Sequence, residues 1–371
     1  MAGLHIAVDA SRTTRRQRTG TENYALQLIR SMLALEANPH RFSLYFRDTP
    51  PEGLLSPAPN WSQRVIPWPR MWTHLRFAAA LWWSRPDVTF VPAHTLPRFF
   101  PGRAVVTVHD LGYVHFPEAH PDDERRYLDW STGFSSRRAT LILADSYATQ
   151  RDLTTYYGVS EKKIRVVYPG NDDALKPVTD PEVLANTRAV YGIPEKYLFF
   201  LGTLQPRKNV ARLVKAYAHW REETGNAEIS LVLGGKPGWL YDPAWIEGVP
   251  GVIQTGYIAD ADIAALYSGA LAFVFPSLYE GFGFPVLEAM RCGTPVLCAN
   301  TSSLPELVAD AALLVDPLDV EAIAAGIARL VTDEGLRREL VDKGHRQEQQ
   351  FTWHRAATEA LATLEATAQH G

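Results

Sequence analysis

Two glutamates flank a glycine-rich turn in the second half of the chain. Glu280 and Glu288 lie eight residues apart, and between them stand Gly281, Gly283 and Pro285. The glycines permit a tight turn in which backbone N–H groups approach a ligand closely, and Pro285 can start a helix with Glu288 in its first turn. A helix N-terminus favours a phosphate, because its N–H groups are unpaired and its dipole end is positive. The segment therefore predicts a bound diphosphate with an acid on either side to accept hydroxyl protons, as a sugar nucleotide requires.

Two adjacent cations, Arg207 and Lys208, stand in a loop after another apolar run. Gly202 and Pro206 shape this loop, and Asn209 is placed to cap the helix that follows. Loops after parallel strands share one edge of a sheet, so we expect both cations beside the glycine-rich turn. A diphosphate leaving group gains negative charge as the glycosidic bond breaks, and fixed cations then stabilise the transition state more than the ground state. The alternative is a pair of solvated surface cations.

A histidine and an aspartate follow an apolar run in the first half of the chain, V-V-T-V at 105–108. His109 is thus predicted at the carboxyl end of a buried strand, where ligands bind in α/β sheets. A lone histidine is more often a structural residue. Asp110 is placed to orient the histidine ring or to approach an acceptor hydroxyl.

The segment before the first long predicted helix is basic. Gly20 and Thr21 stand at the start of that helix and are candidates for contact with a phosphate or an acceptor. Four arginines precede them and are suited to a charged acceptor: Arg12, Arg15, Arg16 and Arg18. The alternative is a mobile, solvated basic loop.

Composition excludes several classes of protein. The chain has 371 residues, of which 46% are hydrophobic and 21% charged, with a net charge of −4. These values are typical of a soluble protein of two domains without a general attraction to nucleic acid. The N-terminus has no signal-peptide pattern and no apolar run can span a bilayer, so we expect a cytoplasmic protein. Cys292 and Cys298 fit neither a zinc nor a redox spacing. We expect no metal, because Arg207, Lys208 and the helix N-terminus offset the diphosphate charge.

Apolar runs typical of buried parallel strands alternate with helix-like segments. One series of runs lies at 4–8, 42–46, 88–91, 104–108, 141–144 and 164–167, and a second at 197–201, 229–233, 252–255, 271–275, 296–298 and 313–315. Predicted helices include 22–35, 147–157, 210–223, 260–270 and 320–331. The turn-rich segment 169–181 separates the two series and is predicted to be a hinge. This alternation predicts an α/β protein of two doubly wound, Rossmann-like domains facing a cleft.

The segment at 277–293, S-L-Y-E-G-F-G-F-P-V-L-E-A-M-R-C-G, resembles the E-x7-E signature of the retaining family 4 glycosyltransferases, which have the GT-B fold. Two glutamates at this spacing are common by chance, whereas a strand followed by E-G-F-G-F-P-x-x-E-A-M is not. The resemblance covers nearly the whole chain. It implies an acceptor-side domain of residues 1–172 plus 353–371 and a nucleotide-sugar-binding domain of residues 173–352. It also implies that the last helix crosses back to the first domain.

The resemblance further implies roles for individual residues. Glu280 would contact hydroxyls of the donor sugar and Glu288 the ribose, while Arg207 and Lys208 would bind the diphosphate. His109 would contact the donor sugar as a hydrogen-bond partner more than as a base. Backbone contacts to the sugar or a shaped phosphate site are implied at Gly20, Thr21, Gly281, Phe282, Gly283, Phe284 and Pro285.

Three further positions are candidates for contact with the donor. Many relatives carry an arginine where Thr203 stands, so this departure shifts work to Arg207 or is offset by a hydroxyl contact. Tyr257 follows a strand and is predicted to lie near the nucleotide base. Glu306, at another predicted helix N-terminus, either contacts the nucleotide or caps its helix.

The resemblance implies transfer of a hexose with retention of anomeric configuration, by front-face attack assisted by the leaving phosphate. The loops T-G-T-E-N-Y and G-T-x-x-P-R-K-N look most like bacterial mannosyltransferases of surface-polysaccharide assembly. Mannose and a GDP-sugar donor are therefore favoured, with a saccharide or lipid-linked saccharide as acceptor. One alternative is a sugar-nucleotide epimerase, against which the E-x7-E segment argues. Another is a non-catalytic nucleotide-sugar-binding protein, against which the intact Glu280, Lys208 and His109 argue.

Tryptophan and arginine are concentrated in the segment Arg64–Trp83, which holds Trp68, Trp72, Trp82 and Trp83 together with Arg70 and Arg76. Indoles and basic side chains suit a membrane interface, and family members with lipid-linked acceptors often dock through the first domain. Two interpretations stay open for this segment. One is a helix packed on the sheet with its tryptophans in the core, and the other is peripheral contact with the inner face of the membrane.

Overall fold

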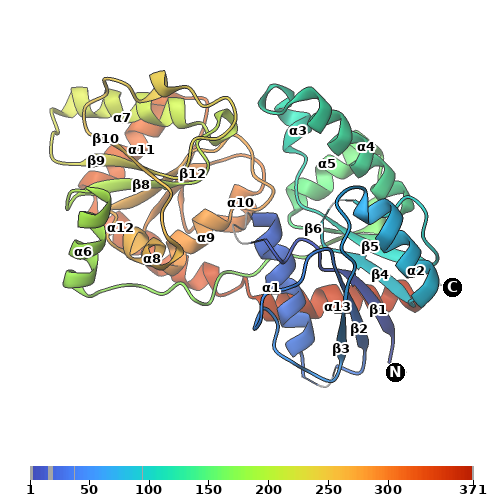
Figure 1. The fold of residues 1–371 in the computed structure, drawn as a ribbon. Helices are drawn as coiled ribbons and strands as arrows, with labels where there is room; N and C mark the ends of the chain where they lie inside the picture. The colour runs from blue at the N-terminus through green and yellow to red at the C-terminus, as the bar shows by residue number, and fades with distance from the viewer. Residues whose placement is uncertain (1–2, 16–19, 37, 94, 370–371) are drawn as a thin grey trace. The chain divides into compact units, whose positions relative to one another are not determined.

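The computed structural model describes residues 3–15, 20–36, 38–93 and 95–369, which form two compact units (Figure 1). Unit 1 comprises Met1–Val114, Asp122–Gly170 and Phe351–Gly371, and unit 2 comprises His115–Pro121 and Asn171–Gln350. The predicted division placed its boundaries after residues 172 and 352, and it assigned 115–121 to the first domain. In the structure these boundaries fall after Gly170 and Gln350, two residues earlier in each case, and residues 115–121 belong to unit 2.

Unit 1 is built on a seven-stranded parallel sheet in the order β3-β2-β1-β4-β5-β6-β7. The strands are β1 His5–Asp9, β2 Arg41–Phe46, β3 Trp61–Val65, β4 Val88–Val91, β5 Arg103–Val108, β6 Leu141–Ala144 and β7 Ile164–Val166. All residues of β4 and β6 are buried. Burial on both faces explains why the sequence shows continuous apolar runs there.

Strand β3 was not predicted. Its sequence W-S-Q-R-V has no apolar run, and its three central residues are exposed. It pairs only with β2, at the edge of the sheet. An edge strand held by backbone hydrogen bonds to one neighbour needs little apolar surface, so hydrophobic patterning does not reveal it.

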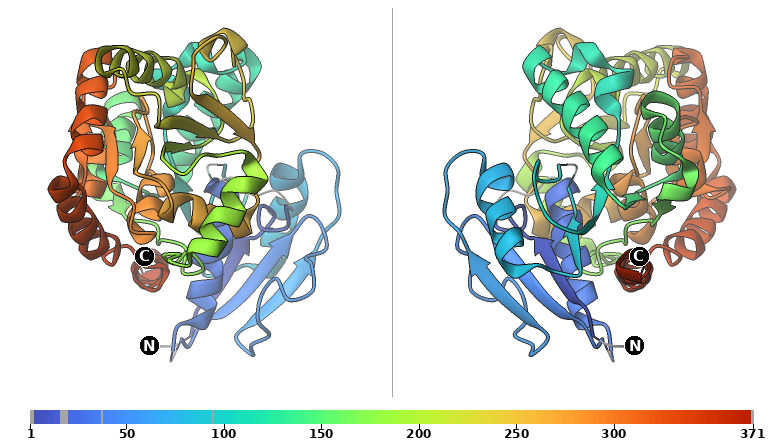
Figure 2. Two further views of the ribbon diagram at one scale, coloured as in Figure 1. Left: turned by 90° about the vertical axis from the view of Figure 1, so that its left-hand side faces the viewer. Right: turned by 90° about the vertical axis from the view of Figure 1, so that its right-hand side faces the viewer.

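The helices of unit 1 pack on both faces of its sheet. They are α1 Gly20–Ala34, the π-helix η1 Thr73–Phe77, α2 Ala78–Ser84, α3 Gly112–His115, α4 Asp122–Arg138, α5 Tyr147–Tyr157, the short η3 Glu161–Lys163 and α13 Trp353–Gln369. The red C-terminal helix α13 lies beside α1 against β4, β5 and β6 (Figures 1 and 2). The predicted return of the last helix to the first domain is therefore confirmed. The start of α13 packs closely against the backbone at Gly170, since a Cβ atom on Gly170 would lie 2.2 Å from the Trp353 nitrogen.

Unit 2 contains a six-stranded parallel sheet in the order β10-β9-β8-β11-β12-β13. Its strands are β8 Tyr197–Leu201, β9 Ser230–Gly234, β10 Val252–Gly256, β11 Ala272–Phe275, β12 Val296–Ala299 and β13 Leu313–Val315. The order reverses between β8 and β11, and loops at such a reversal form the ligand-binding edge of doubly wound sheets. Both units are doubly wound, as predicted.

The helices of unit 2 are α6 Pro181–Tyr191, α7 Val210–Thr224, α8 Asp260–Ser268, α9 Phe284–Arg291, α10 Leu304–Val308, α11 Val320–Thr332 and α12 Glu334–Glu348, with the 3-10 turns η2 Pro117–Ala119, η4 Pro206–Lys208 and η5 Pro243–Trp245. Predicted and observed ends mostly differ by one or two residues, as fraying of helix and strand ends leads us to expect. Among the helices of the described residues, none is long and apolar enough to cross a membrane.

Candidate active site

An ion cluster of one acid and two cations lies at the reversal point of the unit 2 sheet. Glu280 follows β11, and Arg207 and Lys208 lie in η4, after the neighbouring β8. Lys208 Nζ donates to Glu280 Oε1 at 2.6 Å, and Arg207 Nη1 lies 3.3 Å from Oε2. The structure thus brings together the two segments that the sequence predicted to be neighbours.

The two cations of the cluster keep the Glu280 carboxyl ionised. Burial by itself raises the pKa of the Glu280 carboxyl, but the charges of Lys208 and Arg207 and the hydrogen bonds to Glu280 outweigh it. The pKa of Glu280 therefore lies below its ordinary value, and Glu280 is an anion at neutral pH. Two cations thus pair with one buried carboxylate.

The turn after Glu280 is held by two serines that the sequence analysis missed. Ser302 Oγ accepts from the Glu280 N–H at 2.9 Å, while Ser303 Oγ donates to the carbonyls of Glu280 and Phe282, at 2.9 and 2.7 Å. Both serines follow β12, the strand next to β11. A T-S-S sequence after a buried strand is the signal that could have revealed them.

Gly283 adopts a backbone conformation that residues with a side chain rarely adopt. Its φ is +118°, in the region that L side chains rarely adopt, and it directly precedes α9. A Cβ atom there would lie 2.7 Å from Leu304 Cδ2. The next residues, Phe284 and Pro285, start the helix, and the Phe282 and Phe284 rings meet edge to face.

Glu288 lies in the second turn of α9, not in the first as predicted, because the helix begins at Phe284 rather than at Pro285. Its Oε2 atom accepts from the hydroxyl of Tyr267, a buried residue of α8, at 3.1 Å. Burial raises the pKa of Glu288 to about 7, only partly offset by the Tyr267 hydrogen bond. Glu288 is thus poised to change charge near neutral pH.

Asn209 does not cap α7 as predicted. Its side chain makes no cap hydrogen bond to the helix and instead donates to the carbonyls of Pro276 and Pro317 at 2.9 and 2.6 Å. Its φ is +61°. Asn209 therefore ties the loop of Arg207 and Lys208 to the end of β11, which is a positioning role for the ion cluster.

In unit 1, His109 directly follows β5 and is 7% exposed. Its Nδ1 atom lies 2.7 Å from Asp145 Oδ2, and its Nε2 atom lies 3.0 Å from the Pro92 carbonyl oxygen. Thr149 Oγ1 donates to the His109 carbonyl at 3.0 Å, and the Tyr24 ring meets the imidazole edge on. The histidine is therefore held at its ring and at its backbone.

The structure sets Asp145 against this ring, and the two roles predicted for Asp110 remain predictions. The Oδ1 atom of Asp110 accepts from the Gly112 N–H at 2.8 Å, at the start of α3. Burial by itself lowers the pKa of His109, but the charge and hydrogen bond of Asp145, with smaller contributions from Pro92 and Asp110, raise it above its ordinary value.

The first turn of α1 carries a buried acid that the sequence analysis did not select. Glu22 is 4% exposed in the first turn of α1, and its Oε1 atom lies 3.6 Å from Arg12 and 3.8 Å from Arg15. Gly20 and Thr21 are the first two residues of α1. Arg16 and Arg18 lie outside the described residues.

The remaining predicted positions lie in the loops and helices around the unit 2 sheet. Thr203 is exposed in the loop after β8. Tyr257 follows the edge strand β10, two strands away from β8, and its hydroxyl donates to Asp260 at 3.3 Å. Glu306 lies in the first turn of α10, and Gly281 is buried beside Glu280. In the described part of the chain, no group of three or more acidic, cysteine or histidine side chains is arranged to hold a metal.

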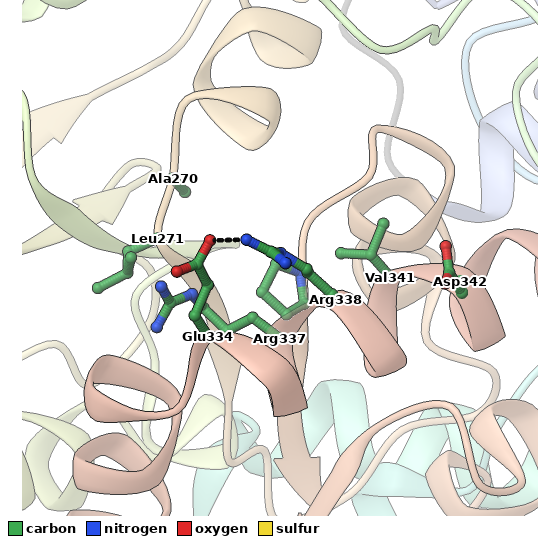
Figure 3. A pocket seen from close by; sticks show the side chains of 8 residues that line it. Ala270, Leu271, Glu334, Arg337, Arg338, Val341 and Asp342 are labelled. Carbon is green, nitrogen blue, oxygen red and sulfur yellow. Dashed lines mark hydrogen bonds and ion pairs between the residues drawn. The ribbon is translucent and has the colours of Figure 1, made fainter.

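A pocket of about 430 Å³ lies elsewhere on unit 2, at the start of α12 (Figure 3). It is lined by residues that precede β11 and β12, Ala270, Leu271 and Pro295, and by side chains of α12. It therefore opens at the amino ends of the strands, whereas Glu280 follows the carboxyl end of β11. Arg338 pairs with Glu334 there, and Arg337 donates to carbonyls at the end of α11.

Comparison with known proteins gives matches over most of the chain. Residues 18–175 match the model of the family described as Glycosyltransferase Family 4, and residues 185–347 match that of Glycosyl transferases group 1. The O-antigen chain mannosyltransferase B of Escherichia coli is 36% identical over 264 residues, which cover 70% of this chain and 69% of that protein. The serotype-specific mannosyltransferase WbdA of Escherichia coli is 29% identical over 286 residues, which cover 73% of this chain but only 34% of that protein.

The fold also matches solved structures. HepE from Anabaena, in complex with UDP-glucose, superposes with a TM-score of 0.74 at 18% identity, over 98% of this chain and 100% of that one. At this identity the likeness concerns the fold alone.

Proposed function

This chain belongs to the family 4 glycosyltransferases and has their GT-B fold, and from that premise we propose that it transfers mannose from a GDP-sugar donor to a saccharide or lipid-linked saccharide acceptor, with retention of anomeric configuration. Two relatives support the sugar, because both are named as mannosyltransferases. One of them acts on an O-antigen chain, which supports a saccharide acceptor. The complex of HepE with UDP-glucose supports a nucleotide-sugar donor.

The observation that carries this proposal is the ion cluster of Glu280, Lys208 and Arg207 at the reversal point of the unit 2 sheet. In the proposed reaction, the acceptor hydroxyl oxygen bonds to C1 of the donor sugar on the face from which the diphosphate leaves. The bond from C1 to the diphosphate oxygen breaks, and the acceptor proton passes to the departing phosphate. Lys208 and Arg207 stabilise the negative charge that develops on that phosphate.

The neighbouring acids recognise the donor. Glu280, kept ionised by its two cations, accepts hydrogen bonds from sugar hydroxyls, and Glu288 accepts from the ribose. The backbone from Gly281 to Gly283 lines the sugar, and the start of α9 at Phe284 and Pro285 receives the diphosphate. In unit 1, His109 and the first two residues of α1, Gly20 and Thr21, are the residues proposed to contact substrate.

We further propose that the reaction is independent of a metal ion. Two fixed cations and a helix N-terminus supply the positive charge for which nucleotide-binding enzymes often use Mg²⁺. Activity that survives EDTA unchanged would support this part of the proposal. Loss of activity in EDTA, restored by Mg²⁺ or Mn²⁺, would overturn it.

The segment Arg64–Trp83 supports peripheral contact with the inner face of the membrane. Only Trp72 belongs to the core, where it stacks on Phe77, so core packing accounts for one of the four tryptophans. Trp82 and Trp83 of α2 are 52% and 91% exposed, and Arg76 lies 4.9 Å from the ring centre of the exposed Trp68. Exposed indoles beside arginines suit an anionic lipid surface.

Vesicle flotation tests this contact. We expect the enzyme to float with phosphatidylglycerol vesicles, and a Trp82→Ala, Trp83→Ala double variant to remain in solution. Trp239→Ala removes an exposed tryptophan of unit 2 and serves as the matched control. Wild-type protein that stays wholly in solution with anionic vesicles would contradict membrane docking.

The proposed function is tested first by thermal shift with GDP, UDP, ADP and their sugar conjugates. A ligand at a hundredfold excess over its dissociation constant stabilises by about 2.7 kcal/mol. We expect a shift with GDP-mannose, followed by GDP release that depends on a saccharide acceptor. Conversion of the donor without an acceptor would indicate an epimerase, and binding without turnover would indicate a non-catalytic binding protein.

A further inference from the structure

Two buried histidine–carboxylate pairs lie in the described part of unit 1. They differ in the hydrogen-bond partner of the second ring nitrogen, the one that does not face the carboxylate. His40 is 2% exposed, and its Nε2 atom lies 2.8 Å from Glu365 Oε1. Its other ring nitrogen, Nδ1, accepts from the Leu4 N–H at 3.1 Å. One ring N–H and one lone pair satisfy both bonds, so the neutral imidazole suits His40.

The ring of His109 faces two acceptors instead. Nδ1 lies 2.7 Å from a carboxylate oxygen of Asp145, and Nε2 lies 3.0 Å from the carbonyl oxygen of Pro92. A carbonyl cannot donate, so Nε2 must carry a proton. A proton is also required between Nδ1 and Asp145, because two lone pairs at 2.7 Å would repel. The pair therefore holds one proton more than a neutral imidazole beside a carboxylate.

We infer that Asp145 is a positioning residue that holds His109 as a doubly protonated imidazolium, and that His109 therefore does not serve the transfer reaction as a base. This inference rests on the proposed function for the reaction that it serves. The proton between the two side chains resides on the imidazole, since imidazole is the stronger base by about 2.6 units in ordinary surroundings. Loss of that ring charge would leave the Asp145 carboxylate buried without a countercharge, which is costly.

The surroundings of Asp145 point the same way. Asp145 is 3% exposed, and no hydrogen-bond donor from the described residues reaches its Oδ1 atom. His109 therefore provides the hydrogen bond and the charge that offset the burial of this carboxylate. The other titratable groups near the ring are Asp110, whose charge also favours the imidazolium, and the Tyr24 phenol, which stays neutral because burial raises its pKa well above its ordinary value.

Strand register and the first turn of α5 explain how Asp145 reaches the ring. β5 and β6 pair in parallel with Val108 opposite Ala144, so the residues that follow these strands emerge side by side. Thr149, at the start of α5, binds the His109 carbonyl, and Ser146 caps the helix by accepting from the Thr149 N–H. The segment D-S-Y-A-T at 145–149 thus holds both the ring and the backbone of His109.

A positive ring fixed in this way has a consequence for catalysis. An imidazolium with both N–H groups donated to protein acceptors has no lone pair with which to take a proton. Its charge is balanced by the Asp145 carboxylate, and the ion pair fixes the position of the ring beside the Pro92 carbonyl. Loss of the ion pair should release the ring from this position and lower kcat more than it raises KM.

The protonation state can be read directly by NMR of the full-length enzyme labelled with ¹⁵N at its histidine rings. Substitution His109→Gln assigns the resonances of His109 by their loss, and His40 serves as the internal reference with one protonated nitrogen. We expect both ring nitrogens of His109 to be protonated at pH 7.5. In Asp145→Asn we expect His109 to carry one ring proton at that pH, and in Asp145→Glu we expect the imidazolium to return. Wild-type His109 with a single protonated nitrogen at pH 7.5, or a signal that Asp145→Asn leaves unchanged, would overturn the inference.

Steady-state kinetics supply the second measurement. We expect Asp145→Asn to lower kcat by about tenfold or more with little change in KM, and Asp145→Glu to recover part of the loss. An equal kcat for wild type and Asp145→Asn would overturn the catalytic part of the inference. The NMR titration needs no donor or acceptor, so a wild-type enzyme that transfers no sugar would count against the proposed function and leave the measured charge of the ion pair unaffected.

Discussion

Lys208 Nζ lies 2.6 Å from Glu280 Oε1, although 72 positions of sequence separate the two residues. Strands β8 and β11 are adjacent in the unit 2 sheet, and each residue stands in the loop after its strand. The pair, with Arg207, keeps a buried carboxylate ionised. The charge of Glu280 and the proposed binding of the diphosphate therefore depend on the same three side chains.

We expect Lys208→Ala to lower kcat by about a hundredfold or more, because it removes a cation from the departing diphosphate. It also leaves Glu280 with Arg207 as its remaining counterion in this cluster. The rate of acceptor-dependent nucleotide release measures the effect, and calorimetry shows whether the donor still binds. Lys215→Ala, which removes an exposed lysine of α7, is the matched control. A Lys208→Ala enzyme within about twofold of wild type would show that the ion cluster is not the site of the reaction.

Glu288 predicts a pH dependence of donor binding. Burial raises its pKa to about 7, so it gains its charge as the pH rises through that value. A carboxylate accepts ribose hydroxyls better than a carboxylic acid does, and we expect donor affinity to rise between pH 6 and 8. In Glu288→Gln this rise should be absent. Isothermal titration at several pH values measures the affinity, and equal pH profiles for the two proteins would refute the assignment of Glu288.

The same group affects stability in the opposite direction. A carboxyl whose pKa is raised in the folded state binds more protons there than in the unfolded chain. Glu288 therefore stabilises the folded protein at pH values below the pKa that it has in the unfolded chain. This stabilisation is lost as the pH rises through about 7. We expect the donor-free enzyme to lose on the order of 2 kcal/mol between pH 5 and 8 relative to Glu288→Gln. Chemical denaturation at the two pH values measures it, and a loss equal in both proteins would contradict the expectation.

Gly283→Ala should destabilise unit 2 and weaken donor binding. The added methyl group meets Leu304 and Leu307 at a φ of +118°, so strain and overpacking add. We expect a loss of at least about 2 kcal/mol in the free energy of unfolding. Gly248→Ala, also at positive φ but with open space around its Cβ position, should cost about 1 kcal/mol. Equal losses for the two variants would show that the space around Gly283 is not restrictive.

The tryptophans of the segment Arg64–Trp83 should differ in how much they contribute to stability. Trp72 is 5% exposed, stacks on Phe77 and donates to the Ile66 carbonyl, so Trp72→Ala should cost about 3–5 kcal/mol of stability. Trp83 is 91% exposed, and Trp83→Ala should change stability by less than about 0.5 kcal/mol. Denaturant unfolding tests both values. A stable Trp72→Ala protein would mean that the core packing described for unit 1 is wrong.

The sequence was sufficient for the order of most strands along the chain and for the α/β class, because continuous apolar runs are what strands buried on both faces require. The return of the last helix followed from the family resemblance instead. The sequence was also sufficient for the two segments of the ion cluster, since loops after parallel strands share one edge of a sheet. The sequence did not reveal β3, whose exposed residues carry no periodic signal. The prediction also put Glu288 in the first turn of its helix instead of the second, because Pro285 occupies the second helical position rather than the first.

The partners of the predicted residues were decided by the tertiary structure alone. Asp145 reaches His109 through the register of β5 and β6, and Ser302 and Ser303 hold the Glu280 turn from the next strand. The Asn209 amide donates to the Pro276 and Pro317 carbonyls instead of capping its helix. Such contacts join residues far apart in the chain and depend on distances of a few tenths of an ångström. Local sequence determines which residue types can do chemistry and which strands must be buried. Only the packed sheet determines which acceptor faces each donor, and with it the charge that each side chain carries.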